Sequence, residues 1–349
     1  MKVVIIHLDG LGFEYFKKSD LQFTKFLRGP LYRMRIFPGY FSNEVSLFTG
    51  LSPKQHHMED LFVLDPEKNP FKSNLFKLIP NKLIPLIARF YGYKTYIELK
   101  IKKDYLKLFV PVAKDHPYNF LNTFPMMLAD NNIRFKYLNS FNFSAYQIQE
   151  AIRSNDCIYA MNSSFDKLLH KQITPRLIAQ YIDDIIKKVY HFLIDNFKDN
   201  FCLIILSDHG MIDVKGKINL DKPNIDNEIR FIDSTILRVW GVNNHRFKNP
   251  HTILYDSTIL PNTQFKYYKK YLAKPGYIFS PNFFQGHNTI KGMHGYDSTH
   301  SPHDAFVLIH HPQFQRQNTG NCSIIDIAPT ILKIFKIKQP SHMKGVPLI

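Results

Sequence analysis

The strongest constraint on the fold is an apolar run at Phe201–Leu206 that ends abruptly in the polar sequence SDHG at 207–210. Six consecutive apolar residues predict a strand that is buried on both faces, as in a parallel α/β sheet. Ligand sites in such sheets lie just beyond the carboxyl ends of the strands, which is where Asp208 and His209 stand. An Asp–His pair can bind a divalent metal such as zinc through oxygen and nitrogen. A loop or a helix start is the alternative for an isolated Asp-His dipeptide.

Two other predicted strands lead into residues of the same kind. Residues 3–8 are predicted to form a strand that is followed by Asp9, and residues 157–161 a strand that precedes Asp166 and His170. A spacing of four places Asp and His on one face of a helical turn, where they can share an ion. Taken singly, the alternatives are a turn at Asp9 and a surface ion pair for the other two.

A long amphipathic helix is predicted between the strands at 157–161 and 201–206. Thr174 is its expected N-cap, Pro175 its first residue, and its apolar face continues to Phe197. Strand, helix and strand in this order form a βαβ unit, so the central sheet should be mostly parallel.

Two further segments carry polar residues suited to chemistry. His294 lies between glycines, on tight and accessible backbone that suits a metal ligand, with a surface turn as the alternative. After a break at residues 38–39, Ser42 is the expected N-cap of a short helix that Gly50 ends. A hydroxyl at a helix N-terminus is well placed to attack phosphorus, because the free amides and the dipole stabilise the developing anion. An ordinary capping serine is the alternative.

Length and composition indicate a large core domain with an insertion. We expect a metal-binding α/β core at residues 1–54 and 151–349 and an inserted cap, or substrate region, at residues 55–150. The cap range is rich in Lys, Phe, Tyr, Leu and Pro, and part of residues 212–290 is expected to join it. Residues 75–91 are apolar and basic, which suits peripheral contact with a membrane or a lipid-linked substrate; packing on the core is the alternative.

The charge of the chain bears on its binding partners, and its cysteine content bears on its cellular compartment. The chain has 45 Lys and Arg against 29 Asp and Glu, a formal charge of +16, which favours anionic partners unless it serves solubility alone. No nucleic-acid-binding motif is present. The three cysteines are far apart, form no Cys-x-x-Cys pair and lie in apolar runs. We therefore expect buried thiols, a reducing compartment and a cytoplasmic location. The short apolar run at the N-terminus is expected to be a core strand rather than a signal peptide. No apolar segment reaches the length needed to span a bilayer.

The polar residues at the predicted strand ends match the needs of two divalent ions. Three protein ligands per ion leave an open position for a substrate, and two adjacent ions can clamp the attacking and leaving oxygens of a phosphoryl displacement. The six candidates are three aspartates and three histidines: Asp9, Asp166, His170, Asp208, His209 and His294.

The order of these segments resembles the alkaline phosphatase superfamily, specifically its type I phosphodiesterase and nucleotide pyrophosphatase branch. The matching motifs run from residue 3 to residue 348, whereas the cap range carries little signal, and the block FIDSTILRVW at 231–240 resembles a subgroup of the branch. The motifs are LDG at 8–10, TGLSP at 49–53, D-x-x-x-H at 166–170, SDHGM at 207–211, MHGYD at 293–297 and DIAPTIL at 326–332.

The resemblance implies an alkaline-phosphatase-like fold, with a mostly parallel sheet sandwiched by helices and an inserted cap. It also implies hydrolysis of a nucleotide-like or phospho-alcohol-like phosphate ester through a covalent phospho-enzyme. Two divalent metal ions are expected, zinc or alternatively manganese. By resemblance, one is held by Asp9, Asp208 and His209, and the other by the set Asp166, His170 and His294.

The chain departs from the family pattern at the nucleophile. The family's Ser or Thr lies ten residues before the Gly of the Thr-Gly pair, a position that Tyr40 occupies here. We assign the role to Ser42, with Tyr40 second and Ser46 third, and we expect Asn43 to contact a phosphoryl oxygen unless it is structural. The alternatives are a transferase that moves a phospho-alcohol to a glycan or lipid, and a metal-binding member that has lost catalysis.

Overall fold

The structure of the protein is a computed structural model. It describes residues 1–39, 41–56, 58, 62–65, 67, 69, 71–73, 76, 78–80, 82–90, 106, 108–111, 122–139, 143–220, 228–241, 247–259, 267–281, 290–297, 303–314 and 319–349.

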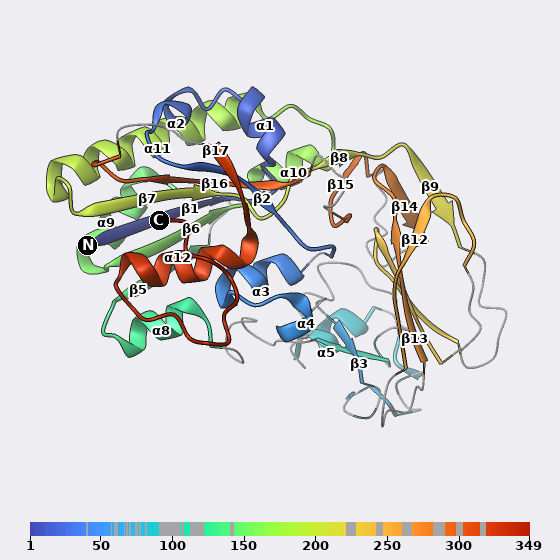
Figure 1. Ribbon diagram of the computed structural model, residues 1–349. Helices are drawn as coiled ribbons and strands as arrows, with labels where there is room; N and C mark the ends of the chain where they lie inside the picture. The colour runs from blue at the N-terminus through green and yellow to red at the C-terminus, as the bar shows by residue number, and fades with distance from the viewer. Residues whose placement is uncertain are drawn as a thin grey trace.

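A seven-stranded sheet forms the centre of the molecule, in the order β17-β2-β16-β7-β1-β6-β5 (Figure 1). Only β16 runs antiparallel to its neighbours, so the prediction of a mostly parallel sheet is confirmed. The strands are β1 (Lys2–Leu8), β2 (Leu31–Arg35), β5 (Phe135–Asn139), β6 (Cys157–Asn162), β7 (Phe201–Leu206), β16 (Ala305–His310) and β17 (Thr319–Ser323).

The central strands have apolar side chains on both faces because helices cover both faces. In β1, Val4 and Ile6 pack into one core, while Val3 and Ile5 pack into the other. The predicted sandwich of helices is therefore confirmed, and Figure 1 shows α11 and α12 on opposite sides of the sheet.

The helices of the first face are α1 (Phe13–Lys18), α2 (Gln22–Phe26), α9 (Ala145–Ser154) and α11 (Arg176–Phe197), with α10 (Ser164–Leu169) at its edge. Those of the second face are α3 (Ser42–Thr49), α8 (Phe124–Asp130) and α12 (Ile327–Ile334), the last preceded by the 3-10 helix η4 (Ile324–Asp326). None of the helices in the described ranges is both long and apolar enough to cross a bilayer.

The predicted βαβ unit consists of β6, α11 and β7, which run parallel on either side of β1. The long helix starts at Arg176, and Pro175 is its N-cap, so the expected cap at Thr174 is wrong. The register of the three strands places their carboxyl ends side by side, since Leu8 lies opposite Asn162 and His7 lies opposite Leu206. Side chains that follow these strands therefore meet at one edge of the sheet.

The predicted cap range includes residues that belong to the core layers. β5, at the edge of the central sheet, and the helices α8 and α9 all fall within residues 55–150. Phe135 pairs with Cys157, whose strand is buried, so the core resumes well before residue 151. The short alternating strand β5 was a weak signal next to the Pro- and Lys-rich stretch before it.

A second, antiparallel sheet lies beside the central one, in the order β10-β11-β13-β12 (Figure 1). Its β10 and β11 share one apolar cluster with residues 62–109, in which Phe109 packs against Phe231 and Trp240. This shared core supports the expectation that part of residues 212–290 joins the cap.

The strands of this sheet are β10 (Ile229–Ile232), β11 (Ile236–Trp240), β12 (Thr252–Ile259) and β13 (Tyr267–Ala273). Smaller strand pairs are β3 (Phe62–Leu64) with β4 (Phe109–Pro111), β8 (Ile212–Asp213) with β15 (Gly292–Met293), and β9 (Gly216–Asn219) with β14 (Tyr277–Ser280). Two short helices, α4 (Pro53–His56) and α5 (Ile84–Phe90), complete the described elements.

Asp156 ties together the amino ends of three core strands. Its carboxylate accepts hydrogen bonds from Lys2 Nζ at 3.1 Å and from the backbone N–H and Nε of Arg134, each at 3.1 Å. Partial burial alone would raise the pKa of Asp156, but the hydrogen bonds from Arg134 and Lys2 lower it to about 2. The carboxylate therefore stabilises the fold at pH values above its unfolded pKa of about 4, and this contribution is lost as the pH falls toward 2.

We expect Asp156→Asn to lower the free energy of unfolding by about 1 kcal/mol at pH 7, a value reduced for the solvent exposure of the network. The difference from the unchanged protein should shrink as the pH falls from 4 toward 2. Urea titrations across this pH range measure it. Asp184→Asn is the control, because Asp184 pairs only with Lys188 on exposed helix surface among its described contacts. A loss at pH 7 that persists unchanged at pH 3 would contradict the assignment.

Candidate metal centre

The six predicted ligands lie at the carboxyl edge of the central sheet. Asp9 directly follows β1, Asp208 and His209 follow β7, and Asp166 lies on α10, which follows β6. The backbone N–H of Asp166 donates to the carbonyl of Asp9 at 3.1 Å, which joins α10 to the segment after β1. His294 comes from the segment after β15. The parallel topology thus gathers residues that are far apart in sequence.

Asp9, Asp208 and His209 form the first group. One ligand atom from each lies within 4.8 Å of the others, and Nε2 of His209 lies 3.3 Å from Asp9 Oδ1 and 3.5 Å from Asp208 Oδ2. Asp208 and His209 are buried. The donor set of two carboxylates and one imidazole suits a zinc-like ion.

Asp166, His170 and His294 form the second group, with ligand atoms likewise within 4.8 Å of one another. Nε2 of His170 lies 3.3 Å and Nε2 of His294 3.8 Å from Asp166 Oδ1. The two groups adjoin, because the rings of His209 and His294 stack with their centroids 3.7 Å apart and an angle of 8° between the planes. The structure therefore brings together all six candidates in the division that the resemblance implied.

Backbone carbonyls fix the tautomers of two of the histidines. Nδ1 of His170 lies 2.7 Å from the carbonyl of Gly292, and Nδ1 of His209 lies 3.1 Å from the carbonyl of Gly210. A carbonyl oxygen can only accept, so each Nδ1 carries the proton and each neutral ring presents its lone pair at Nε2. Both Nε2 atoms face the carboxylates, which is the orientation of a metal-binding histidine.

Charge crowding in the first group also fits a cation. Burial, together with the charges of Asp208 and Asp166, raises the pKa of Asp9 to about 7. Burial would lower the pKa of His209, but the Asp208 and Asp9 carboxylates raise it to about 10. Without a cation the carboxylates must retain protons or draw them to the imidazole. A divalent ion neutralises the same charges and needs the deprotonated ligands.

The second group contains an oxygen atom that lacks a hydrogen bond. Asp166 Oδ1 is buried and accepts none, although two imidazole nitrogens approach it. A buried carboxylate oxygen without a partner is costly, and a bound metal satisfies it. The residues present therefore fit a divalent ion in each group.

His7 supports the first group and is a residue that we did not predict. It is 1% exposed, its Nε2 lies 3.1 Å from Asp208 Oδ1, and its Nδ1 lies 2.8 Å from the Tyr159 hydroxyl. The backbone N–H of Gly10 donates to the same carboxylate oxygen at 3.3 Å. Contacts of this kind orient a ligating carboxylate. The available signal was the histidine that interrupts the apolar run of β1.

The segment that carries Ser42 is attached to the loop of His294. The backbone N–H of Gly39 and the hydroxyl of Thr235 both donate to the carbonyl of Gly295, at 3.1 and 3.2 Å. Gly295 has φ of +87°, and an added Cβ would lie 2.8 Å from Thr235 Oγ1, so a larger residue does not fit this junction.

Ser42 is the first residue of α3 rather than its N-cap, so the expected capping role is wrong. The N-cap is Phe41, and the buried Ser42 hydroxyl donates to the carbonyl of Pro38 at 3.1 Å. Gly50 ends the helix in the left-handed conformation, as predicted, with φ of +65°. Ser42 thus holds a hydroxyl at the positive end of the α3 dipole.

The other candidates on this segment have different positions. Asn43 uses both polar atoms on Phe37, accepting from its N–H at 2.7 Å and donating to its carbonyl at 2.9 Å, which favours the structural alternative over a substrate contact. The Ser46 hydroxyl lies 3.1 Å from Nε2 of His56, whose Nδ1 accepts from Met58 N–H, so the imidazole donates to Ser46 and does not activate it as a base. Tyr40 lies outside the described residues.

A family model described as Type I phosphodiesterase / nucleotide pyrophosphatase matches residues 3–252. No curated protein sequence matches the chain.

Three solved structures share the fold. Murine ectonucleotide pyrophosphatase / phosphodiesterase 5 has a TM-score of 0.65 and 15% identity, over 99% of this chain and 97% of that one. The human protein of the same name has a TM-score of 0.65 and 15% identity, with coverages of 98% and 96%. An inactive variant of the murine protein in complex with AMP gives a TM-score of 0.65, 15% identity and coverages of 99% and 97%. The alkaline-phosphatase-like fold is confirmed.

We expect His7→Leu to weaken zinc binding to the first group by roughly 10- to 100-fold, because Asp208 loses the side chain that orients it. Tyr159→Phe should have a smaller effect in the same direction. Competition with a chromogenic chelator measures the affinity. The matched control is His342→Leu, since His342 is exposed and belongs to neither ligand group. Equal zinc affinity in the His7 and His342 variants would exclude the supporting role.

Proposed function

Because the chain belongs to the type I phosphodiesterase / nucleotide pyrophosphatase family and is a phosphoric ester hydrolase, we propose that it cleaves a phosphodiester with two divalent ions and a covalent phosphoserine at Ser42. One ion would be held by the first group and the other by the second. Zinc is our choice, with manganese as the alternative, since Asp and His bind both. The AMP bound to the inactive murine relative makes a nucleotide-like ester one candidate substrate.

One observation carries the proposal: the two ligand groups adjoin through the stacked rings of His209 and His294. Two ions side by side would lower the pKa of a serine hydroxyl and stabilise both the attacking and the leaving oxygens of an in-line displacement. Asp166 Oδ1, buried without a hydrogen bond, supports the same conclusion from a different atom.

In the proposed reaction the Ser42 hydroxyl gives up its proton as its oxygen bonds to phosphorus. The bond from phosphorus to the departing alcohol oxygen breaks, and this alcohol leaves protonated. Water then attacks the same phosphorus, which releases a phosphate monoester and restores the hydroxyl. The first-turn amides of α3 have no acceptor within the helix, so they can stabilise the negative charge on the phosphoryl oxygens.

A second candidate is transfer of a phospho-alcohol to a lipid or glycan acceptor, with peripheral membrane contact. It is favoured by the apolar side chains that α5 and its surroundings expose, with Leu86 70% and Phe90 87% accessible and the cationic Lys82 and Arg89 also exposed. Apolar and cationic side chains together suit an anionic bilayer surface. Product formed only when a glycolipid acceptor is present, without hydrolysis, would replace the first candidate by this one.

We also propose a cytoplasmic location. All three cysteines are free, and Cys157 and Cys202 are buried in the core. Burial raises the pKa of the Cys202 thiol to about 12, so it is inert as a nucleophile and serves packing. Free thiols are typical of a reducing compartment.

We expect Ser42→Ala to lower kcat for bis(p-nitrophenyl) phosphate by roughly 10³-fold or more, because the covalent step loses its nucleophile. Ser52→Ala is the matched control, since the Ser52 hydroxyl has its described hydrogen bond to Gln55 and the substitution leaves the backbone bonds in place, and it should retain activity. Release of p-nitrophenolate by zinc-loaded protein is the measurement.

Two further arms decide between the alternatives. Chelation should abolish turnover, and zinc or manganese should restore it. If Ser42→Ala is active while Tyr40→Phe is inactive, Tyr40 is the nucleophile. No turnover and no metal uptake with any ion would mean a degenerate member that lacks the proposed activity.

A further inference from the structure

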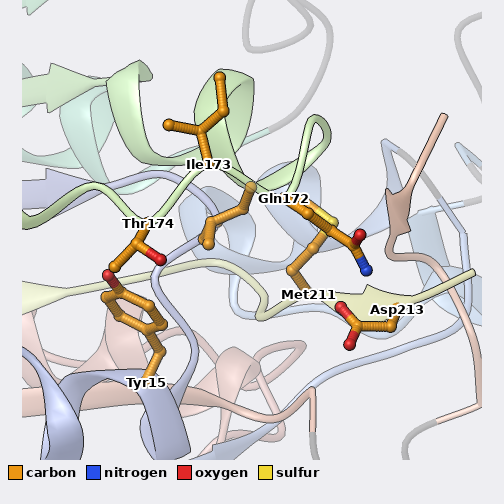
Figure 2. Close-up of a pocket in the computed structure, with 8 residues that line it drawn as sticks. Tyr15, Gln172, Ile173, Thr174, Met211 and Asp213 are labelled. Atoms are coloured by element: carbon orange, nitrogen blue, oxygen red, sulfur yellow. The ribbon is translucent and has the colours of Figure 1, made fainter. Parts of the chain in front are cut away.

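The segment that carries His294 is held on the side that precedes this ligand. Nδ1 of His170 donates to the carbonyl of Gly292 at 2.7 Å, so the second group itself contributes to this support. Gly292 also pairs with Asp213 where β15 meets β8. Asp213 and Met211 line a pocket of about 470 Å³, as Figure 2 shows. Because β15 and β8 share only two residue pairs, the position of His294 depends on the side that follows it as well.

On that following side, hydrogen bonds connect the second group to the proposed nucleophile. Gly295 comes directly after His294, and its carbonyl accepts from the backbone N–H of Gly39 at 3.1 Å. Gly39 comes directly after Pro38, whose carbonyl accepts from the Ser42 hydroxyl at 3.1 Å. Because only two hydrogen bonds lie between the metal-ligand segment and the hydroxyl, the position of Gly295 affects the distance between them.

Thr235 provides the second hydrogen bond to the Gly295 carbonyl, from its hydroxyl at 3.2 Å. It lies at the tip of the hairpin that joins β10 to β11, and two neighbouring strands hold this tip. The carbonyl of Thr235 accepts from Ala273 N–H on β13, and the carbonyl of Ser234 accepts from Phe279 N–H on β14, each at 2.8 Å. Thr235 is 1% exposed, so water is excluded from its contact with Gly295. The second sheet therefore presents a fixed donor to the metal centre.

We propose that Thr235 is a positioning residue that holds the Gly295 carbonyl and thereby sets the distance between the second metal group and the Ser42 hydroxyl. The inference deepens the proposed function and rests on it. A carbonyl oxygen has two lone pairs, so it can accept from Gly39 and Thr235 together, and loss of one donor lets the other bond shift. A displacement of about 1 Å at a reacting group can cost roughly 100-fold in rate. This role also accounts for the segment FIDST at 231–235, which contributes none of the six ligands.

The kinetic test uses Thr235→Val, which removes the hydroxyl and keeps the shape of the side chain. We expect kcat for bis(p-nitrophenyl) phosphate to fall roughly 10- to 100-fold, with KM changed less than about threefold, because Thr235 orients the reacting groups and does not bind the ester. Thr235→Ser keeps the hydroxyl and should recover most of the lost rate. The matched control is Thr252→Val, because the Thr252 hydroxyl donates to the carbonyl of Asn249 at the start of β12.

Zinc binding gives a readout that does not depend on turnover. Asp208→Asn weakens the first group, so chelator competition in this background reports on the second group. There Thr235→Val should weaken zinc binding about tenfold, since His294 loses support, and Thr235→Ser should weaken it much less. In a His170→Ala background, which removes the second group, Thr235→Val should leave the remaining zinc affinity unchanged.

The possible outcomes separate this inference from the function beneath it. Turnover and zinc affinity of Thr235→Val equal to those of Thr252→Val overturn the positioning role alone. Thr235→Ser as impaired as Thr235→Val overturns it too, because the hydroxyl would then not be the group that acts. An unchanged protein that neither binds zinc nor cleaves the ester overturns the proposed function together with the inference. All variants are assayed well below their melting temperatures, so that unfolding does not enter the comparison.

Discussion

The common level at which β1, β6 and β7 end is the constraint on which the site depends. Parallel pairing places Leu8 opposite Asn162 and His7 opposite Leu206. The residues that follow these strands therefore lie close together at one edge of the sheet. Their meeting is electrostatically unfavourable in the absence of a cation, as the raised pKa of Asp9 shows. The apolar cores on both faces hold the strands in register and thus hold the carboxylates together against their repulsion.

The parts of the fold that sequence could predict are those with strong local signals. The unbroken run at β7 and the apolar face of α11 indicated a parallel sheet, because their periodicity reflects burial directly. The edge strand β5 was missed as part of the core, since its half-buried alternation follows a long stretch without clear pattern. Cap residues were hardest to assign because their apolar partners on β10 and β11 lie more than a hundred residues away.

The site divides in the same way. Residues adjacent to predicted strand ends could be named, whereas His7 could not, because its role follows from which side of β1 faces Asp208. Asn43 shows the opposite case, a residue whose sequence position suggested a role that its hydrogen bonds do not favour. Its position in the sequence suggested a phosphoryl contact, but a local turn offers both a donor and an acceptor on Phe37 at short range, and a neutral amide takes such partners first.

The apolar cluster shared by residues 62–109 and the second sheet has a consequence for how this protein can be dissected or recombined. Excision of the inserted stretch alone would leave Phe231 and Trp240 facing water, and such bare aromatic surface promotes aggregation. Residues 62–109 and the second sheet should therefore be moved together as one unit. Chimaeras with other scaffolds of this architecture should exchange both pieces in one step, with the crossover points placed in the parallel sheet's own connections.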